Sequence, residues 1–155
     1  MTKYFFIIAI VFLLTNCGFK VVDYSKLNNF KIYDIVTAGE NRINYKVKNN
    51  IKVISNNNSS REIIINLFSV SKKSIKEKNN SNEITKYKLE INTKVDYKIL
   101  NNNKTGNFEM LVSGDYLVAQ KYSETLKNQA RLIDNLTLEI SSQIKRKLSN
   151  QLNDL

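Results

Sequence analysis

The stretch TKYKLEINTKVDYKI, residues 85–99, decides the fold class of this chain. From Thr85 to Ile99 every second residue is apolar or Thr, and the residues between them are Lys, Glu, Asn and Asp. Strict alternation over this length is typical of a β-strand with one face against a core and the other in water. The sequence therefore predicts a sheet that is buried on one side only.

The segments around this strand complete the sheet. Residues 107–118 repeat the alternation, and the polar link 101–106 predicts a hairpin in which Gly106 supplies a positive φ. Residues 61–71 are apolar on both sides and β-branched, which favours a more central strand. Residues 30–38 form a shorter β-rich run.

Two segments have the period of a helix instead. After Gly39, apolar residues recur every three or four positions at Ile43, Val47, Ile51 and Ile54. From Ser123 a similar stripe predicts a long helix over about residues 123–152: Leu126, Ala130, Ile133, Leu136, Ile140, Ile144, Leu148 and Leu152.

The predicted order is β-α-β-β-β-α. Because one sheet face is apolar and the other is rich in Lys, both helices are expected on the apolar face. The fold class is α+β: a two-layer sandwich with one mostly antiparallel four-stranded sheet and two helices packed on one face. We expect the first strand to pair in parallel with the second through a helical crossover, and the last three to form a meander. The long helix is long enough to outrun the sheet, which would leave its last turns free or against a partner.

The amino-terminal segment predicts export and a lipid anchor. Lys3 precedes an apolar run that ends at Leu14, and the only cysteine, Cys17, follows three positions later. The run is too short to cross a bilayer, which needs about 20 apolar residues. A Leu three positions before a Cys is typical of a bacterial lipobox, although Asn16 departs from the usual small residue before the Cys. We expect a signal peptide over residues 1–16 and lipid attachment at Cys17, by a diacylglycerol and an N-acyl chain. The alternatives are a secreted protein without a lipid and an uncleaved anchor.

The remaining chain is expected to form a lipidated linker over residues 17–29 and a single α+β domain over residues 30–155. Gly18 stands where an Asp would hold a lipoprotein in the inner membrane, so the chain is expected in the periplasmic leaflet of the outer membrane.

The formal net charge of +10 favours acidic partners: anionic lipid headgroups, lipopolysaccharide phosphates or an acidic protein surface. Nucleic acid is not expected as a partner of an exported chain. A composition biased toward Lys, Asn and Ile by an AT-rich genome is the alternative source of this charge. The densest cluster is Lys72, Lys73, Lys76 and Lys78, predicted as a basic loop that contacts headgroups or phosphates. The alternative is a loop kept soluble by its charge.

The polar face of residues 85–99 carries Lys86, Lys88, Lys94 and Lys98. It permits the same two interpretations and a third, in which a polar sheet face lies against the polar interior of an outer-membrane barrel.

Catalytic chemistry has little basis in this sequence. The chain has no His, and lipid attachment would use its only thiol. Ser and Lys adjoin in Ser71-Lys72-Lys73-Ser74, but such adjacency is expected by chance in so Lys-rich a chain. We expect no enzyme activity, no metal site and no cofactor other than the lipid on Cys17.

The start motif Cys17-Gly18-Phe19, the following Lys20 and the order of elements together resemble the LptE family of lipopolysaccharide-assembly lipoproteins, particularly its α-proteobacterial members. The likeness includes the last helix, with Tyr122, Ala130, Arg131, Leu132 and Ile140. Val21-Val22-Asp23 replaces the usual Pro-containing stretch. The resemblance implies a non-catalytic protein that plugs the outer-membrane barrel LptD, assists its folding and binds lipopolysaccharide.

Two other functions remain open from the sequence. One is an accessory lipoprotein of the barrel-assembly machinery or of a secretion channel. The other is a lipid-anchored periplasmic protein that binds a ligand or carries a lipid, which would need an apolar cavity.

Overall fold

The computed structural model describes residues 30–53 and 59–153, which form four strands and two helices in the predicted order. The strands are β1 (Lys31–Gly39), β2 (Glu62–Lys78), β3 (Ile84–Ile99) and β4 (Thr105–Leu117), and the helices are α2 (Asn41–Lys52) and α3 (Tyr122–Asn153). The α+β fold class is confirmed. Ile54 and the Asn run at 56–58 lie outside the described residues.

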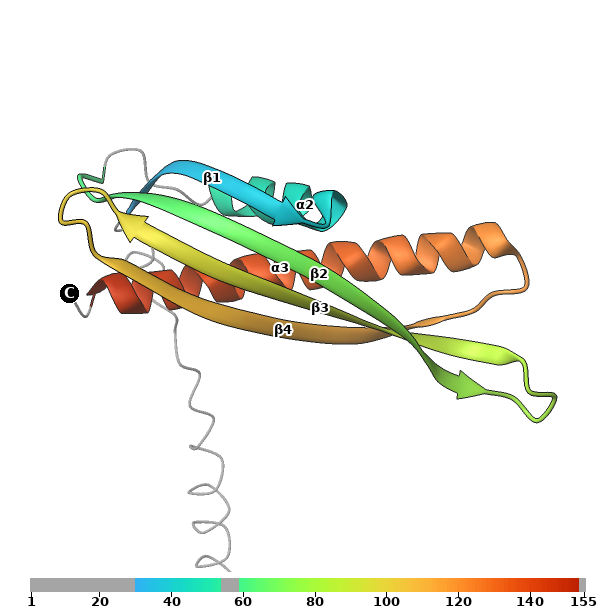
Figure 1. Ribbon diagram of the computed structural model, residues 1–155. Coiled ribbons are helices and arrows are strands. Elements are labelled where there is room, and N and C mark those ends of the chain that lie inside the picture. Colours follow the sequence, from blue (N-terminus) through green and yellow to red (C-terminus); the bar gives the residue numbers. More distant parts are fainter. Residues whose placement is uncertain (1–29, 54–58, 154–155) are drawn as a thin grey trace, which may run out of the picture.

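The sheet has the order β1-β2-β3-β4. β1 pairs with β2 in parallel, and β3 is antiparallel to both of its neighbours, as the crossover and meander predict. The two helices lie on the same side of this sheet (Figure 1). Both helices therefore cover the same face of the sheet and leave the opposite face to solvent.

The core lies between the sheet and the helices. On β2, Ile63, Ile65 and Leu67 are at most 1% exposed, and their partners on β3 and β4 continue the same face. On α3, Ile140 and Ile144 are fully buried. Burying each such side chain contributes about 1.5–3 kcal/mol, so this layer supplies most of the stabilisation.

A sharp turn joins β1 to α2. Gly39 has φ +90°, and an added Cβ would lie 3.2 Å from the backbone N and C of Ser69. Asn44, which is 1% exposed, donates from Nδ2 to the Ala38 carbonyl at 2.6 Å and so closes the turn. Gly39 is required here because only glycine combines this φ with so close an approach of two strands.

The β3–β4 hairpin differs from the prediction at one residue. Asn103 has the positive φ of 56°, whereas Gly106 lies within β4 opposite Tyr97. A Cβ on Gly106 would lie 2.7 Å from Tyr97 Cε1. The prediction for Gly106 was wrong because the glycine accommodates a cross-strand aromatic ring, and asparagine tolerates the left-handed turn position.

The expectation that the last turns of the long helix outrun the sheet was also wrong. Leu148 and Leu152, in the last turns of α3, are fully buried, whereas Tyr122 and Leu126, in its first turns, are 75% and 45% exposed. The last turns are held because the Arg61 guanidinium at the start of β2 donates to the carbonyl of Leu152. A cation that binds a helix C-terminal carbonyl satisfies an unpaired acceptor and complements the helix dipole.

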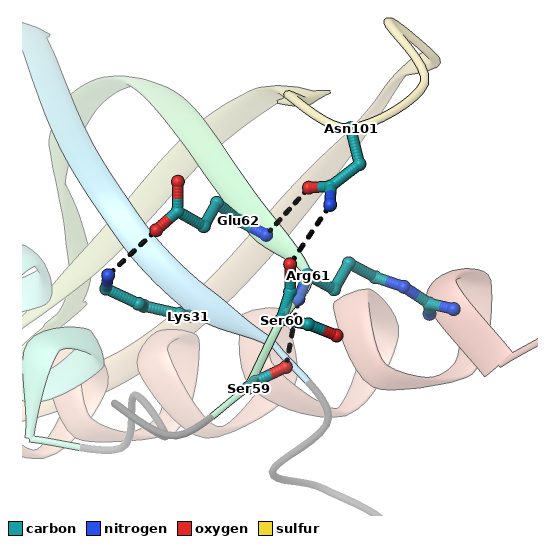
Figure 2. A network of polar contacts seen from close by, with 6 residues as sticks. All are labelled: Lys31, Ser59, Ser60, Arg61, Glu62 and Asn101. Carbon is teal, nitrogen blue, oxygen red and sulfur yellow. Dashed lines mark hydrogen bonds and ion pairs between the residues drawn. The ribbon is translucent and has the colours of Figure 1, made fainter.

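The same end of the sheet carries a polar network, and we call it the proximal end (Figure 2). Lys31 of β1 forms an ion pair with Glu62 of β2 at 2.7 Å. The Glu62 N–H donates to Asn101 Oδ1 at 3.3 Å, and Asn101 Nδ2 donates to the carbonyl of Ser60 at 3.1 Å. These contacts join β1, β2 and the β3–β4 turn where the described chain begins.

Candidate functional site: the β2–β3 extension

The predicted basic cluster lies in a strand, not in a loop. β2 continues to Lys78 and pairs with β3 along its whole length, so that Lys72 lies opposite Glu90 and Ser74 opposite Lys88. The prediction of a loop was wrong because polar residues beyond Ser71 lack apolar alternation, while pairing with the long β3 holds them extended. We call residues 72–90 the β2–β3 extension; β4 pairs with β3 only as far as Lys86, so the tip of the extension runs past the end of β4 (Figure 1).

The true turn of this hairpin is short. It begins at Asn79, whose Oδ1 accepts the N–H groups of Ser81 and Glu83 at 3.0 and 2.9 Å. Asn82 has φ 64° and its side chain accepts a hydrogen bond from Lys78 Nζ at 2.8 Å. Asparagine suits both tasks, since it bonds nearby backbone and tolerates positive φ.

The strand places Lys72 and Lys73 of the predicted cluster on opposite faces of the sheet. Successive side chains of a strand point to opposite faces, so Lys72 and Lys73 are on different sides of the sheet. Lys72 shares the solvent face with Glu90, and its charge is a minor contributor to the lowered pKa of that carboxyl, after Lys88. The four residues therefore do not form one compact patch, which the sequence spacing alone suggested.

Lys73 lies on the helix side, against two aromatic rings. Its Nζ is 3.8 Å from the ring centroid of Tyr87 and 5.7 Å from that of Tyr116, and the two rings stack at 5.6 Å. The Tyr116 hydroxyl is buried and makes no hydrogen bond of standard geometry with the described residues, yet its proximity raises the pKa of Lys73. Lys73 is thus a cation held by aromatic faces.

Lys76 lies at an irregularity of β2. The register of β2 shifts between Ile75 and Glu77, which marks a β-bulge at Lys76. Lys76 is exposed and makes no ion pair with the described part of the chain. Together with Lys72 it offers positive charge on the extension.

The solvent face of the sheet is less basic than predicted. Lys86 pairs with Glu77 at 2.8 Å, Lys88 with Glu90 at 2.7 Å and Lys94 with Asp96 at 3.7 Å. Lys86, by hydrogen bond and charge, holds the pKa of the Glu77 carboxyl below its usual value. Such exposed pairs contribute little to stability, but they neutralise the face. Apolar side chains also interrupt it, with Phe68 47% and Leu111 66% exposed.

Two surface cavities lie beside α3. One of about 290 Å³ separates α2 from α3 and contains the Lys46–Asp134 ion pair, and the other of about 260 Å³ lies between Leu117 and Arg131. Both are wide open to solvent, so neither encloses the space that a lipid chain would occupy.

Cys17 lies outside the described residues, as do the predicted signal peptide and linker. Within residues 30–53 and 59–153, no helix combines the length and the apolar character needed to span a membrane. The same residues contain no group of three or more acidic, Cys or His side chains that could hold a metal ion.

Sequence reasoning missed two features of this site, namely the aromatic contacts of Lys73 and the acidic partners of the lysines on the solvent face. The contact of Lys73 and the pair of Lys86 with Glu77 join residues of different strands, whereas Lys88 and Lys94 pair with acidic residues two positions further along β3. The alternation in residues 85–99 placed Tyr87 on the core side correctly, but only the register of β2 brings Lys73 over that ring.

Comparison with known proteins shows the fold. No family model matches the chain, and no curated protein sequence matches it. Among solved structures, the chain is similar to rare lipoprotein B from Shewanella oneidensis, with a TM-score of 0.60 and 9% identity over 78% of this chain and 97% of that one. It is also similar to uncharacterized lipoprotein B from Nitrosomonas europaea, with a TM-score of 0.61 and 14% identity over 88% and 93% of the two chains.

Proposed function

We propose that this chain is a non-catalytic lipoprotein of the outer membrane, anchored through Cys17 in the periplasmic leaflet. In this proposal it partners and plugs an LptD-like barrel and assists lipopolysaccharide assembly at the cell surface. The observation that carries the proposal is the agreement between the fold and those of two lipoproteins over most of each chain. The start motif at Cys17, which resembles that of the LptE family, supports it independently.

The solvent face of the sheet supports a contact with a polar surface. Its paired charges, such as Lys88 with Glu90, and its scattered apolar residues, such as Phe68, match the mixed lining of a barrel lumen better than a purely basic face would. The sequence contains no His, the side chain that most often acts as a general acid or base, which supports the proposed non-catalytic role.

The lysines of the extension are proposed to contact the phosphates of lipopolysaccharide. The exposed Lys72, Lys76 and Lys78 carry this role, because Lys73 is already held by Tyr87 and Tyr116. Lys ammonium groups act as point charges toward phosphate, so binding should weaken with salt.

The partner is tested by affinity purification of the tagged full-length protein from solubilised outer membranes. Co-purification of a large barrel together with lipopolysaccharide is expected. Recovery of barrel-assembly or secretion components instead would contradict the proposal. A Cys17→Ser variant is the control for anchoring, and mass spectrometry of the wild-type protein should find acyl chains on Cys17.

The phosphate contact has a separate test. Changing Lys72, Lys73, Lys76 and Lys78 together to Gln should weaken lipopolysaccharide binding at least about tenfold, which corresponds to about 1.4 kcal/mol. The matched control changes Lys86, Lys88, Lys94 and Lys98, which removes the same charge from the neighbouring strand. Equal losses in both variants would show that only net charge matters.

A further inference from the structure

β2 has an open edge in the extension. β1 ends at Gly39, opposite Ser69, and the chain then turns into α2, while β2 continues to Lys78. β3 occupies only the other edge of this part of β2. Among the described residues, no strand pairs with β2 beyond Ser69 on the side that β1 has left.

The backbone groups on this edge can be assigned. The Ser69 carbonyl accepts the Glu40 N–H at 2.8 Å, and the Ser71 N–H donates to Glu40 Oε1 at 2.6 Å. Odd-numbered residues therefore point toward the side of β1. Because strand N–H groups alternate in direction, those of Lys73 and Ile75 point to the same open side. An edge of this kind is a template for pairing with another strand.

The first open position already holds a carboxylate. Glu40, just beyond β1, accepts from both the backbone N–H and the hydroxyl of Ser71, at 2.6 and 2.7 Å. This is an internal example of an acidic group bound to the edge of β2 where regular pairing stops. It indicates which chemistry the next positions would accept.

The charge of the edge points to the same ligand. Four of the residues from 72 to 78 are Lys, and the one carboxylate among them, Glu77, is paired with Lys86 of β3. Lysines on an edge strand disfavour pairing with neutral or basic strands, and they attract an acidic one.

We propose that the open edge of β2, from Lys72 to Lys78, binds an extended acidic segment of a partner protein by strand addition, in continuation of β1. Main-chain hydrogen bonds to Lys73 and Ile75 provide the pairing, and the lysine side chains select acidic residues. This inference goes beyond the proposed function, because the binding groups are backbone amides and the ligand is a protein strand.

The test uses the isotope-labelled full-length protein in detergent micelles and a synthetic octapeptide of alternating Val and Glu as the probe. Nuclear magnetic resonance should show shifts of the Lys73 and Ile75 amides that saturate with peptide and weaken with salt. A peptide of alternating Val and Gln should bind at least about fivefold more weakly, because it lacks the charge that the lysines select. No shift of these two amides at millimolar peptide would overturn the proposal.

A proline variant separates strand addition from simple charge attraction. Ile75→Pro removes one outward N–H and leaves every lysine in place, and proline is tolerated where the N–H of an edge strand faces solvent. We expect at least about tenfold weaker peptide binding in Ile75→Pro and none of this loss in Ile75→Ala. Ser74→Pro, which removes an N–H that faces β3, should disrupt the extension itself.

The outcomes of the proline test are distinct. Equal peptide binding by Ile75→Pro and the wild type would show that only the lysine side chains act, and the proposal would fail. Lipopolysaccharide binding should be insensitive to Ile75→Pro, since phosphates need no strand register. Self-association of the protein that the peptide does not inhibit would assign the edge to a second copy and would also overturn the proposal.

Discussion

Ile65 and Ile75 are the same residue type on the same strand and the same face of the sheet, yet Ile65 is fully buried and Ile75 is 52% exposed. The helices make the difference. Ile65 belongs to the buried core cluster that includes residues of α2 and α3, whereas the tip of the β2–β3 extension runs out past the end of β4 (Figure 1). Alternation along a strand thus determines which face a residue occupies, and the second layer determines whether that face is buried.

Different interactions stabilise the covered part of the sheet and the β2–β3 extension. The covered region depends on apolar burial, with Ile140 and Ile144 of α3 fully buried above the sheet. The extension depends on cross-strand hydrogen bonds, the ion pair between Glu77 and Lys86, and the contact of Lys73 with Tyr87. Because the latter are weak in water, the extension should open locally at a lower free energy than the rest.

The largest expected effect tests the comparison directly. Ile65→Ala should lower the free energy of unfolding by about 2–5 kcal/mol, because it removes buried methyl groups and leaves a cavity. Ile75→Ala should lower it by less than about 0.5 kcal/mol. Chemical denaturation of both variants measures the difference, and similar losses would mean that the extension is buried in solution.

The next largest effect concerns the point where β1 leaves β2. Gly39→Ala should lower the free energy of unfolding by about 2 kcal/mol, because φ +90° is strained for alanine and its Cβ meets the Ser69 backbone. Ala38→Gly, in the preceding residue of the strand, provides a control for backbone entropy. Thermal unfolding that is unchanged in Gly39→Ala would show that β1 ends elsewhere.

A smaller effect is expected at the end of α3. Arg61→Ala should lower the free energy of unfolding by about 1 kcal/mol, through loss of the bond to the Leu152 carbonyl. Hydrogen exchange should increase in the last turn of α3 and stay unchanged in the extension. Arg146→Ala, at an exposed position of the same helix, is the control, and equal effects of the two variants would argue against the cap.

The smallest effect is a pH dependence confined to the extension. The hydrogen-bonded lysines Lys86 and Lys88 lower the pKa values of Glu77 and Glu90, respectively, from 4.5. The stability that these pairs contribute is therefore present above about pH 4.5 and is lost as the pH falls through the lowered values. Protection factors of β3 amides in the extension should decrease in acid, and a Glu77→Gln, Glu90→Gln variant should lack this dependence.

Much of the fold was predictable because its signals are local. The alternation in residues 85–99 located β3 and its buried face, and the apolar stripe from Ile133 to Leu152 located the buried part of α3. The order of elements then left few ways to cover one apolar sheet face, so the α+β sandwich followed from pattern and connection rules.

The rest depends on contacts between distant residues. Lys72 to Lys78 are strand because β3 pairs with them, and nothing in their own sequence requires an extended conformation. Leu126 continues the apolar stripe of α3 but is 45% exposed, because the position of the helix over the sheet fixes which turns are covered. The pairing of Lys86 with Glu77 of β2 likewise follows from cross-strand register.

The parallel pairing of β1 with β2 also determines how this molecule bears tension. β1 begins at the proximal end, and β2 runs beside it in the same direction toward the extension (Figure 1). A pull between Phe30 and the extension acts along both strands, so the hydrogen bonds between β1 and β2 are loaded together in shear. They resist more force in this geometry than when they are peeled apart one at a time.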